Sequence, residues 1–537
     1  MELSAARCYL KRQLPLLVVV LIAAAHRGSL PLASFVASTP GAPSARGQTH
    51  GAPNVFNLYL CICYRSEAFG AMRTRGSTRQ LAEVAYVPPS PRYHDQGRRI
   101  VTEEASRPAA TDDAPRAEAM PLSPPLPAPP HDLDSPSHVL IVGDFADING
   151  GQAKVALDSA RMLADAGVQV TFFAACGPVS RRLEHKRISV ICLDQPTILD
   201  DPNRLRAMRR GIWNGEAAKR LTAVIDGLDP TDTVIHCHGY AKGLSPAIGP
   251  VLANAPMPVL FTMHEYFLAC PNGGFYDYRK QEICTRRPLG ASCLATNCDA
   301  RHMLHKGWRV TRQVATWGPG QLPGGLTDVA YISELQREVM TPHLGRKVRL
   351  HHVPNPVDAP ELPPVDPRQN DIFLFVGRLS QEKGAAQFAE AARRAGVRAM
   401  FLGDGEQSET VRRLNPEAEI LGWQPPEAVQ EALGRARALV FPSLWYEGQP
   451  LVPIEALMRG VPVICGTWSA ARECVEHGEN GLVYRQPTVD ALADALTRID
   501  DVPTFDPLPL RQRLGPDAHR RRLLDLYGEM LARRRAA

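Results

Sequence analysis

The sequence predicts an α/β protein built from two Rossmann-like sheets, and three observations carry this prediction. Short apolar strands alternate with helical segments in two separate stretches of the 537-residue chain, which is typical of parallel sheets covered by helices. Several of these strands end in loops rich in glycine and polar residues, as the ligand-binding edges of such sheets do. A segment with repeated prolines at 351–367 separates the two stretches and is typical of a hinge.

Composition and charge exclude several classes of protein. The net charge of +5 is small for this length, and no stripe of basic residues alternates with aromatic ones. We therefore expect no nucleic-acid partner. The 12 cysteines are spread over a long chain, unlike the dense cysteine frameworks of small secreted domains.

The extension at 1–136 differs from the rest of the chain. Basic residues precede an apolar run at 14–25, which is the outline of a secretory signal and is too short for a membrane span. Low-complexity sequence follows, rich in proline, alanine and arginine, and is expected to be disordered. A second interpretation is an over-extended reading frame with the true start at Met72 or Met120, and an uncleaved anchor is a third.

The first regular stretch opens with a strand–helix–strand unit. A strand at 138–142 leads through a glycine-containing loop to a helix at 152–166, and a second strand follows. Gly150 and Gly151 fall at the start of this helix, where backbone amides can approach an anion. A tight turn with positive φ explains the two glycines equally well.

Histidines follow two further strands of this stretch, at 233–237 and 258–263. Side chains at the carboxyl ends of parallel strands face the ligand-binding edge of the sheet. We interpret His236 as a hydrogen-bonded core residue. His238 and His264 are candidates for the site.

Four cysteines are concentrated in the segment 264–318. Cys270, Cys284, Cys293 and Cys298 could close a tetrahedral structural zinc site. Their spacing lacks the paired CxxC knuckles of typical zinc modules. Buried or partly exposed thiols are therefore the alternative.

A basic amphipathic helix is predicted over 299–318. The apolar positions at helical spacing are Met303, Val310, Val314 and Trp317. The basic positions on the other side are Arg301, His305, Arg309 and Arg312. We expect the apolar side to face the core and the charged side to face water. The alternative is contact with an anionic membrane surface or a lipid-diphosphate acceptor.

The second stretch carries two cations and a pair of glycines at strand ends. Its predicted strands are 371–376, 397–402, 419–421, 438–441 and 461–464. Arg378 and Lys383 lie at the start of the helix after the first strand. Cations beside a helix N-terminus form a site suited to a diphosphate. Gly403 and Gly405 follow the second strand.

Two glutamates eight residues apart are the most specific feature. Glu447 lies in a loop flanked by glycine and proline, and Glu455 lies in the helix that follows. Carboxylates in this position suit a hydroxyl-rich ligand because their oxygens accept hydrogen bonds from sugar or ribose hydroxyls.

This glutamate motif resembles the donor-site signature of retaining glycosyltransferases of family 4, which have the GT-B fold with two Rossmann-like domains facing a cleft. The resemblance spans about 137–499. It implies that Glu455 holds the ribose and Glu447 the transferred sugar. Arg378 and Lys383 would stabilise the leaving diphosphate.

The resemblance implies further roles. The position of His264 is similar to that of the histidine in a TxHD element, which would place it with Arg378, Lys383 and Glu447 among the catalytic residues. His238 and Glu265 would lie on the acceptor side. The remaining donor-binding candidates are Gly150, Gly151, Gly403, Gly405, Gly448 and Leu451.

On this resemblance the chain divides into four parts. After the extension, an acceptor-binding Rossmann-like domain at 137–356 contains the cysteine-rich insertion. A nucleotide-sugar-binding domain at 357–505 follows, and a helix at 506–537 is expected to pack back on the first domain.

The implied activity is a hexosyltransferase-type transfer from a nucleotide-diphosphate sugar to a glycan or lipid-linked acceptor in polysaccharide synthesis. No catalytic cofactor is implied. The expected location is cytoplasmic, with peripheral contact at the inner membrane face as an option, so the signal-like segment is discounted. A nucleotide-sugar-binding scaffold and a GT-B-fold epimerase are the alternatives.

Overall fold

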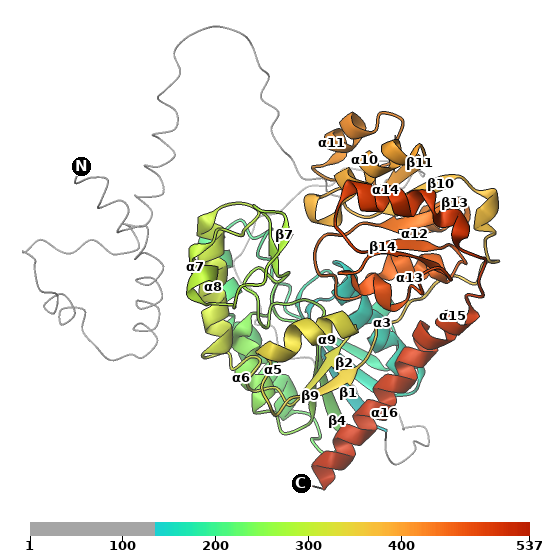
Figure 1. The fold of residues 1–537 in the computed structure, drawn as a ribbon. Helices are drawn as coiled ribbons and strands as arrows, with labels where there is room; N and C mark the ends of the chain where they lie inside the picture. The colour runs from blue at the N-terminus through green and yellow to red at the C-terminus, as the bar shows by residue number, and fades with distance from the viewer. Residues whose placement is uncertain (1–134, 537) are drawn as a thin grey trace, which may run out of the picture. The chain divides into compact units, whose positions relative to one another are not determined.

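The computed structural model describes residues 135–536 (Figure 1). The extension predicted at the amino terminus lies almost entirely outside the described residues. Two parallel sheets with helices on their faces make up most of the described chain. The prediction of an α/β fold with two Rossmann-like sheets is confirmed.

The first sheet has seven parallel strands in the order β3-β2-β1-β4-β5-β8-β9. The reversal of strand order beside β1 is the doubly wound topology that creates a ligand-binding crevice. The strands are β1 (His138–Phe145), β2 (Gln169–Cys176), β3 (Ile188–Cys192), β4 (Thr233–Cys237), β5 (Val259–Thr262), β8 (Asp328–Tyr331) and β9 (Arg349–His352).

The second sheet has six parallel strands in the order β12-β11-β10-β13-β14-β15. The strands are β10 (Ile372–Val376), β11 (Arg398–Leu402), β12 (Glu419–Ile420), β13 (Ala436–Phe441), β14 (Val463–Gly466) and β15 (Gly481–Tyr484). A two-stranded antiparallel ribbon in the cysteine-rich segment consists of β6 (Tyr276–Asp277) and β7 (Glu282–Ile283).

Helices connect the strands and cover the sheets. In the first half they are α3 (Gly151–Asp165), α4 (Arg204–Ile212), α5 (Gly215–Asp226), α6 (Gly249–Ala253), α7 (Ala291–Ala295), α8 (Met303–Trp317) and α9 (Glu334–Met340). In the second half they are α10 (Ala385–Ala395), α11 (Ser408–Leu414), α12 (Pro426–Gly434), α13 (Leu451–Leu457), α14 (Val489–Thr497), α15 (Leu508–Leu514) and α16 (Pro516–Arg535). None of the described helices is long and apolar enough to cross a membrane.

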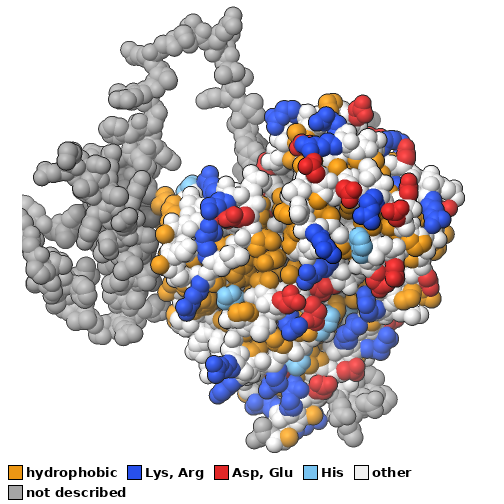
Figure 2. Space-filling view, viewed as in Figure 1, with side chains coloured by type: hydrophobic (Ala, Val, Ile, Leu, Met, Phe, Trp, Pro, Cys, Tyr) orange, Lys and Arg blue, Asp and Glu red, His pale blue; other side chains and the backbone are white. Residues whose placement is uncertain are grey.

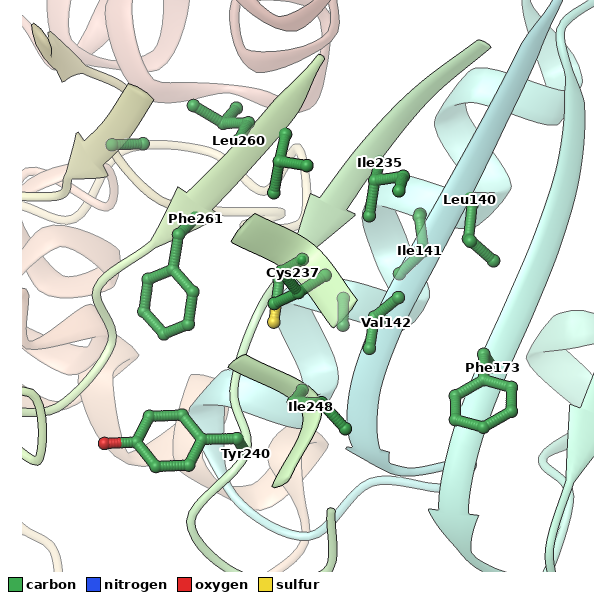
Figure 3. Packing of buried hydrophobic residues seen from close by; sticks show 14 of the residues in the cluster. Leu140, Ile141, Val142, Phe173, Ile235, Cys237, Tyr240, Ile248, Leu260 and Phe261 are labelled. Atoms are coloured by element: carbon green, nitrogen blue, oxygen red, sulfur yellow. The ribbon is translucent and has the colours of Figure 1, made fainter. Parts of the chain in front are cut away.

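The core of the first sheet explains why its strands are so apolar. Leu140, Ile141 and Val142 of β1 are fully buried in one hydrophobic cluster with residues of the neighbouring strands β2 and β4 (Figure 3). A parallel strand covered by helices on both faces has no side open to water, so its sequence is continuously hydrophobic.

The last helix, α16, returns to the first half of the chain. Its Tyr527 hydroxyl lies 2.6 Å from His236 Nδ1, and its His519 Nε2 lies 3.2 Å from Ser159 Oγ. His236 also contacts the Thr262 hydroxyl through Nε2 at 2.7 Å. The interpretation of His236 as a satisfied core histidine is therefore confirmed.

The burial of α8 side chains differs from the prediction on both sides of the helix. Met303, Val314 and Trp317 are 39, 37 and 39% exposed, whereas Lys306 and Arg312 are buried. The expectation that the apolar side faces the core and the charged side faces water is wrong, although Val310 is buried as predicted.

The burial of polar α8 side chains has a physical reason: segments outside the helix provide their hydrogen-bond partners. Arg312 donates to the Ala241 carbonyl at 2.9 Å, and its guanidinium stacks over the ring of Phe267. Gln313 donates to the Leu268 carbonyl at 3.2 Å. These distant partners satisfy polar groups that would otherwise be too costly to bury.

We predict that stability falls in mild acid because His519 is buried in its neutral form. Burial lowers its pKa to about 4, although the hydrogen bond to the Pro354 carbonyl opposes the shift. A lowered folded pKa stabilises the protein above pH ~6.5, and this contribution is lost as the pH falls toward 4. Thermal melts should show His519→Gln losing less stability than wild type between neutral pH and about pH 5, by about 2 kcal/mol.

The exposed His302 provides the matched control. His302→Gln should keep the acid sensitivity of the wild type. Equal sensitivity in His519→Gln and wild type would contradict the assignment of this contribution to His519.

Candidate functional site

The loop after β13, residues 443–449, carries the most strongly bonded carboxylate of the predicted site. Glu447 Oε1 lies 2.5 Å from Lys383 Nζ and accepts hydrogen bonds from Ser443 Oγ at 2.9 Å and Trp445 Nε1 at 2.7 Å. The glutamate side chain is 14% exposed. We call this segment the donor loop.

The charge of Glu447 is maintained despite its burial. Burial alone would raise its pKa, but the ion pair with Lys383 and the two hydrogen bonds hold it below the ordinary value. The glutamate is therefore ionised at neutral pH, as a buried charge with an opposite charge beside it should be.

A close backbone approach brings Lys383 to the donor loop. Lys383 ends a 3₁₀ turn after β10, and Gly384 follows with φ +73°. A Cβ atom on Gly384 would lie 2.3 Å from the Pro442 carbonyl oxygen, so glycine is required there. The Leu444 amide donates to the Glu382 carbonyl at 2.8 Å and fixes the same approach.

The two predicted cations differ in their surroundings. Arg378 is 63% exposed, and its guanidinium lies 3.8 Å from Glu382. Lys383 is 21% exposed and is held by Glu447. The structure thus pairs Lys383 with the predicted glutamate and leaves the guanidinium of Arg378 open to a ligand.

Glu455 lies on α13, the helix that begins after the donor loop. Burial raises its pKa, and the charge of Lys154 opposes the shift. Lys154 belongs to α3 of the first half, so a side-chain charge from the first half acts on the second predicted glutamate.

The start of α3 is open, as an anion site requires. Gly150 has φ +89°, and no side chain caps the helix. A Cβ on Gly150 or Gly151 would meet no atom within 4 Å. The first amides of this 15-residue helix are therefore accessible to a negatively charged group.

The glycines after β11 have a structural reason of their own. A Cβ on Gly403 would lie 1.9 Å from the Gly377 carbonyl, and one on Gly405 would lie 2.3 Å from the Leu379 carbonyl. Both positions need glycine for close backbone packing beside the turn that carries Arg378. Their predicted contact with the donor stays a prediction.

The donor loop is also packed against the first half of the chain. A Cβ on Gly448 would lie 3.2 Å from the His264 carbonyl oxygen. Tyr446 packs against the first hydrophobic core, and Gln449 Oε1 accepts a hydrogen bond from the Asn355 amide at 2.6 Å. Leu451 begins α13 two residues later.

The predicted acceptor residues His238 and Glu265, together with the predicted catalytic His264, line a small pocket at the ends of β4 and β5. His238 Nδ1 lies 3.0 Å from His264 Nε2, and Glu265 forms an ion pair with Lys242 at 2.8 Å. All but Lys242 line the pocket. Burial lowers the pKa of His264 to about 3 and that of His238 well below its ordinary value, so both are neutral.

His238 Nε2 is buried and has no hydrogen-bond partner within the described residues. Such a group is costly to leave unpaired. A hydroxyl group of a ligand could satisfy it.

Three residues of the site escaped the sequence prediction. Ser443 and Trp445 bind the carboxylate of Glu447, and Lys242 pairs with Glu265. Only their short sequence distance from Glu447 and His238 could have indicated that these three residues belong to the site. Their partners depend on loop conformations that the sequence pattern does not reveal.

Two of the four clustered cysteines contact a buried lysine. Lys306 Nζ lies 2.9 Å from Cys298 Sγ and 3.7 Å from Cys293 Sγ. Within residues 135–536 no three His, Cys, Asp or Glu side chains are grouped closely enough to hold a metal ion. Structural zinc stays a prediction that metal analysis tests: protein purified without chelator carries stoichiometric zinc if Cys270, Cys284, Cys293 and Cys298 bind it.

Comparisons with known proteins agree with this geometry. Residues 150–356 match the family described as "Glycosyl transferase 4-like domain". Residues 363–521 match the family described as "Glycosyl transferases group 1".

Two curated relatives match parts of the chain. A predicted teichuronic acid biosynthesis glycosyltransferase of Bacillus subtilis (strain 168) is 33% identical over 146 residues, covering 27% of this chain and 36% of the relative. The UDP-Gal:alpha-D-GlcNAc-diphosphoundecaprenol alpha-1,3-galactosyltransferase of Escherichia coli is 29% identical over 148 residues, covering 25% of this chain and 38% of the relative. The matched stretches span little more than a third of these relatives.

Among solved structures, the apo form of the lipopolysaccharide outer core galactosyltransferase WaaB aligns with 72% of this chain and 98% of its own, at 14% identity and a TM-score of 0.49. The two family matches, each lying on one doubly wound sheet, show that the chain belongs to the family 4-type glycosyltransferases with the GT-B fold.

Proposed function

We propose that the protein is a retaining hexosyltransferase that moves a sugar from a nucleotide-diphosphate donor to a hydroxyl of a glycan or lipid-linked acceptor in bacterial cell-surface polysaccharide synthesis. The observation that carries this proposal is the Lys383–Glu447 pair at the carboxyl edge of the second sheet. It joins a cation for a diphosphate to a carboxylate for a sugar in one place.

Charge development explains the need for the cations. When the bond between the anomeric carbon and the leaving oxygen breaks, negative charge builds on the β-phosphate. Lys383 can keep its contact with Glu447 and still offer further N–H donors, because an ammonium group has three. Arg378, exposed on the same turn, supplies a second positive charge. Fixed cations of this kind stabilise the transition state electrostatically.

The two glutamates have separate proposed roles. Glu447 uses Oε1 for its three protein contacts, which leaves Oε2 for a hydroxyl of the transferred sugar. Glu455 would accept hydrogen bonds from the ribose hydroxyls. The open start of α3 would receive the diphosphate from the other side. Retention would follow if the acceptor attacks from the leaving-group face and the phosphate takes its proton.

The acceptor hydroxyl is assigned to the pocket of His238 and His264. His238 Nε2 has no hydrogen-bond partner within the described residues, so a ligand hydroxyl that reaches it would satisfy this buried group. The E. coli relative, by its name, acts on a diphosphoundecaprenol-linked sugar, which supports a lipid-linked acceptor as the first class to test here.

A lipid-linked acceptor favours contact with a membrane, and α4 and α8 offer a surface for it. Their exposed apolar residues are Leu205 (52%), Met208 (42%), Met303 (39%), Leu304 (54%), Val314 (37%) and Trp317 (39%). The two helices are in contact, since Trp308 Nε1 donates to the Met208 carbonyl at 3.1 Å.

Basic residues accompany this apolar surface. Arg204 and Arg209 of α4 are exposed, and Figure 2 shows Lys and Arg side chains beside hydrophobic ones over α7 and α8. Apolar and basic side chains together suit an anionic bilayer surface. We therefore propose peripheral binding of this α4–α8 surface to anionic membranes.

We predict that one nucleotide sugar among UDP-, GDP-, ADP- and dTDP-sugars raises the melting temperature, because a ligand that binds the folded state stabilises it. Glu455→Ala should abolish this shift. Lys383→Ala should keep most of it while lowering turnover by about a hundredfold. Thermal shift and product formation measure the two effects.

Glu409, exposed at 86% on α11, is the matched control for loss of a carboxylate. Glu409→Ala should change neither readout. A donor-induced shift without transfer to any acceptor hydroxyl would support the scaffold or epimerase alternative. Equal turnover in wild type, Glu455→Ala and Lys383→Ala would contradict the site assignment.

We predict that the protein sediments with phosphatidylglycerol vesicles and that the double variant Met303→Gln, Leu304→Gln weakens this binding about tenfold, because apolar side chains lose their insertion into the bilayer. Neutral phosphatidylcholine vesicles should bind less. Leu508→Gln, which removes a 52% exposed leucine from α15, is the control and should bind as wild type does. Unchanged sedimentation of the double variant would exclude the α4–α8 surface.

A further inference from the structure

The cysteine-rich segment lies directly against the donor loop. A Cβ on Gly274 would lie 3.0 Å from two ring atoms of Trp445. Tyr266, at the start of the same segment, donates its hydroxyl to the Glu447 carbonyl at 3.3 Å. Because Trp445 bonds the Glu447 carboxylate, the segment touches the residue that orients this carboxylate.

The turn that presents Gly274 is tied to the sulfur of Cys298. Asn272 Nδ2 lies 2.9 Å from the Cys298 carbonyl oxygen and 3.3 Å from its Sγ. The Gly273 amide donates to the Cys270 carbonyl at 2.8 Å and closes the turn. Movement of Cys298 would therefore move Asn272 and, two residues later, the surface on which Trp445 rests.

Arg309 holds the same turn from the side of α8. Its guanidinium donates to Asn272 Oδ1 at 3.1 Å and forms an ion pair with the buried Asp299 at 3.0 Å. Arg309 and Lys306 are three positions apart and therefore lie on neighbouring parts of one helix face. This face of α8 therefore contacts the turn directly through Arg309 and indirectly through the contact of Lys306 with Cys298.

Lys306 is the central group of this arrangement. It is 1% exposed, and within the described residues its ammonium donates hydrogen bonds only to the sulfurs of Cys298 and Cys293. Burying an ammonium group is expensive even when it has partners. The lysine lies outside the proposed catalytic pair, so its burial needs a reason other than direct contact with the reacting groups.

We propose that Lys306 is a positioning residue for the donor site: its contact with Cys298 fixes Asn272 and Gly274, and Gly274 sets the position of Trp445 against Glu447. The catalytic meaning of this chain of contacts rests on the proposed function. The physical coupling of Lys306 to Trp445 does not, and it can be measured separately.

The physical coupling is tested by ¹⁹F NMR of the full chain labelled with 5-fluorotryptophan. The Trp445 resonance is assigned as the one missing in Trp445→Phe. Lys306→Met should shift or broaden this resonance, because the turn below the ring loses its anchor, and Gly274→Ala should shift it by direct contact. The surface variant Lys219→Met is the matched control and should leave it in place.

An unchanged Trp445 resonance in folded Lys306→Met would overturn the proposal. If Lys306→Met fails to fold, Asn272→Ala breaks the next link and replaces it, with the same expected shift. An unchanged resonance in that variant would overturn the proposal equally.

The catalytic part is tested by turnover with the donor and acceptor found for the wild type. Lys306→Met should lower kcat by about tenfold to a hundredfold with little change in the donor KM, since a misplaced carboxylate costs rate rather than nucleotide binding. The double variant with Trp445→Phe should be no slower than the slower single variant, because both changes act through one contact.

Additive effects, or a rise in KM alone, would overturn the positioning role. If no donor and acceptor support turnover in the wild type, the proposed function fails. The ¹⁹F experiment still decides whether Lys306 controls the position of Trp445.

Discussion

The buried ion pair between Glu447 and Lys383 is the contact on which the site depends. A carboxylate and an ammonium lose hydration when they are buried. Their mutual attraction offsets this desolvation free energy only if the geometry of the pair and its further hydrogen bonds are favourable. Here one oxygen of Glu447 receives three donors, from Lys383, Ser443 and Trp445. Gly384 lets the lysine turn approach the strand end, since any Cβ there would overlap the Pro442 carbonyl. The pair is therefore fixed before any ligand arrives, which lowers the cost of ordering the site for catalysis.

The position of the pair is set by both halves of the described chain. Gly448 is pressed against the His264 carbonyl, and Gln449 accepts the Asn355 amide. Glu473 of the second half accepts the amides of Glu334 and Leu335, both at 2.8 Å, at the start of α9 in the first half. These contacts place the donor loop beside the histidine pocket without relying on the hinge-like segment alone. The carboxylate proposed to bind the sugar and the neutral imidazoles proposed to bind a hydroxyl thus come from different sheets, which is the arrangement that a transfer between two bound substrates would need.

The regular elements could be predicted closely because their signals are local. The strand expected at 371–376 is β10 at Ile372–Val376, and the helix expected at 152–166 is α3 at Gly151–Asp165. The match of Lys383 with Glu447 could be expected only through the family resemblance, since 64 residues separate them. The roles of Trp445 and Lys242 could not be predicted, because their partners depend on how distant loops fold. Donor and acceptor identity rest on the same unpredictable loop details.

In α8, contacts of buried polar side chains determine which side of the helix faces the core. Hydrophobic burial alone would favour Met303, Val314 and Trp317 facing the core and Arg312, on the opposite side of the helix, facing water. The structure has the opposite arrangement. The inward polar residues bind Cys298, the Ala241 carbonyl and the Leu268 carbonyl. Ala241 and Leu268 line the histidine pocket, and Cys298 holds the turn under Trp445. The helix therefore leaves apolar side chains exposed, while its buried polar side chains bind segments that surround the candidate site.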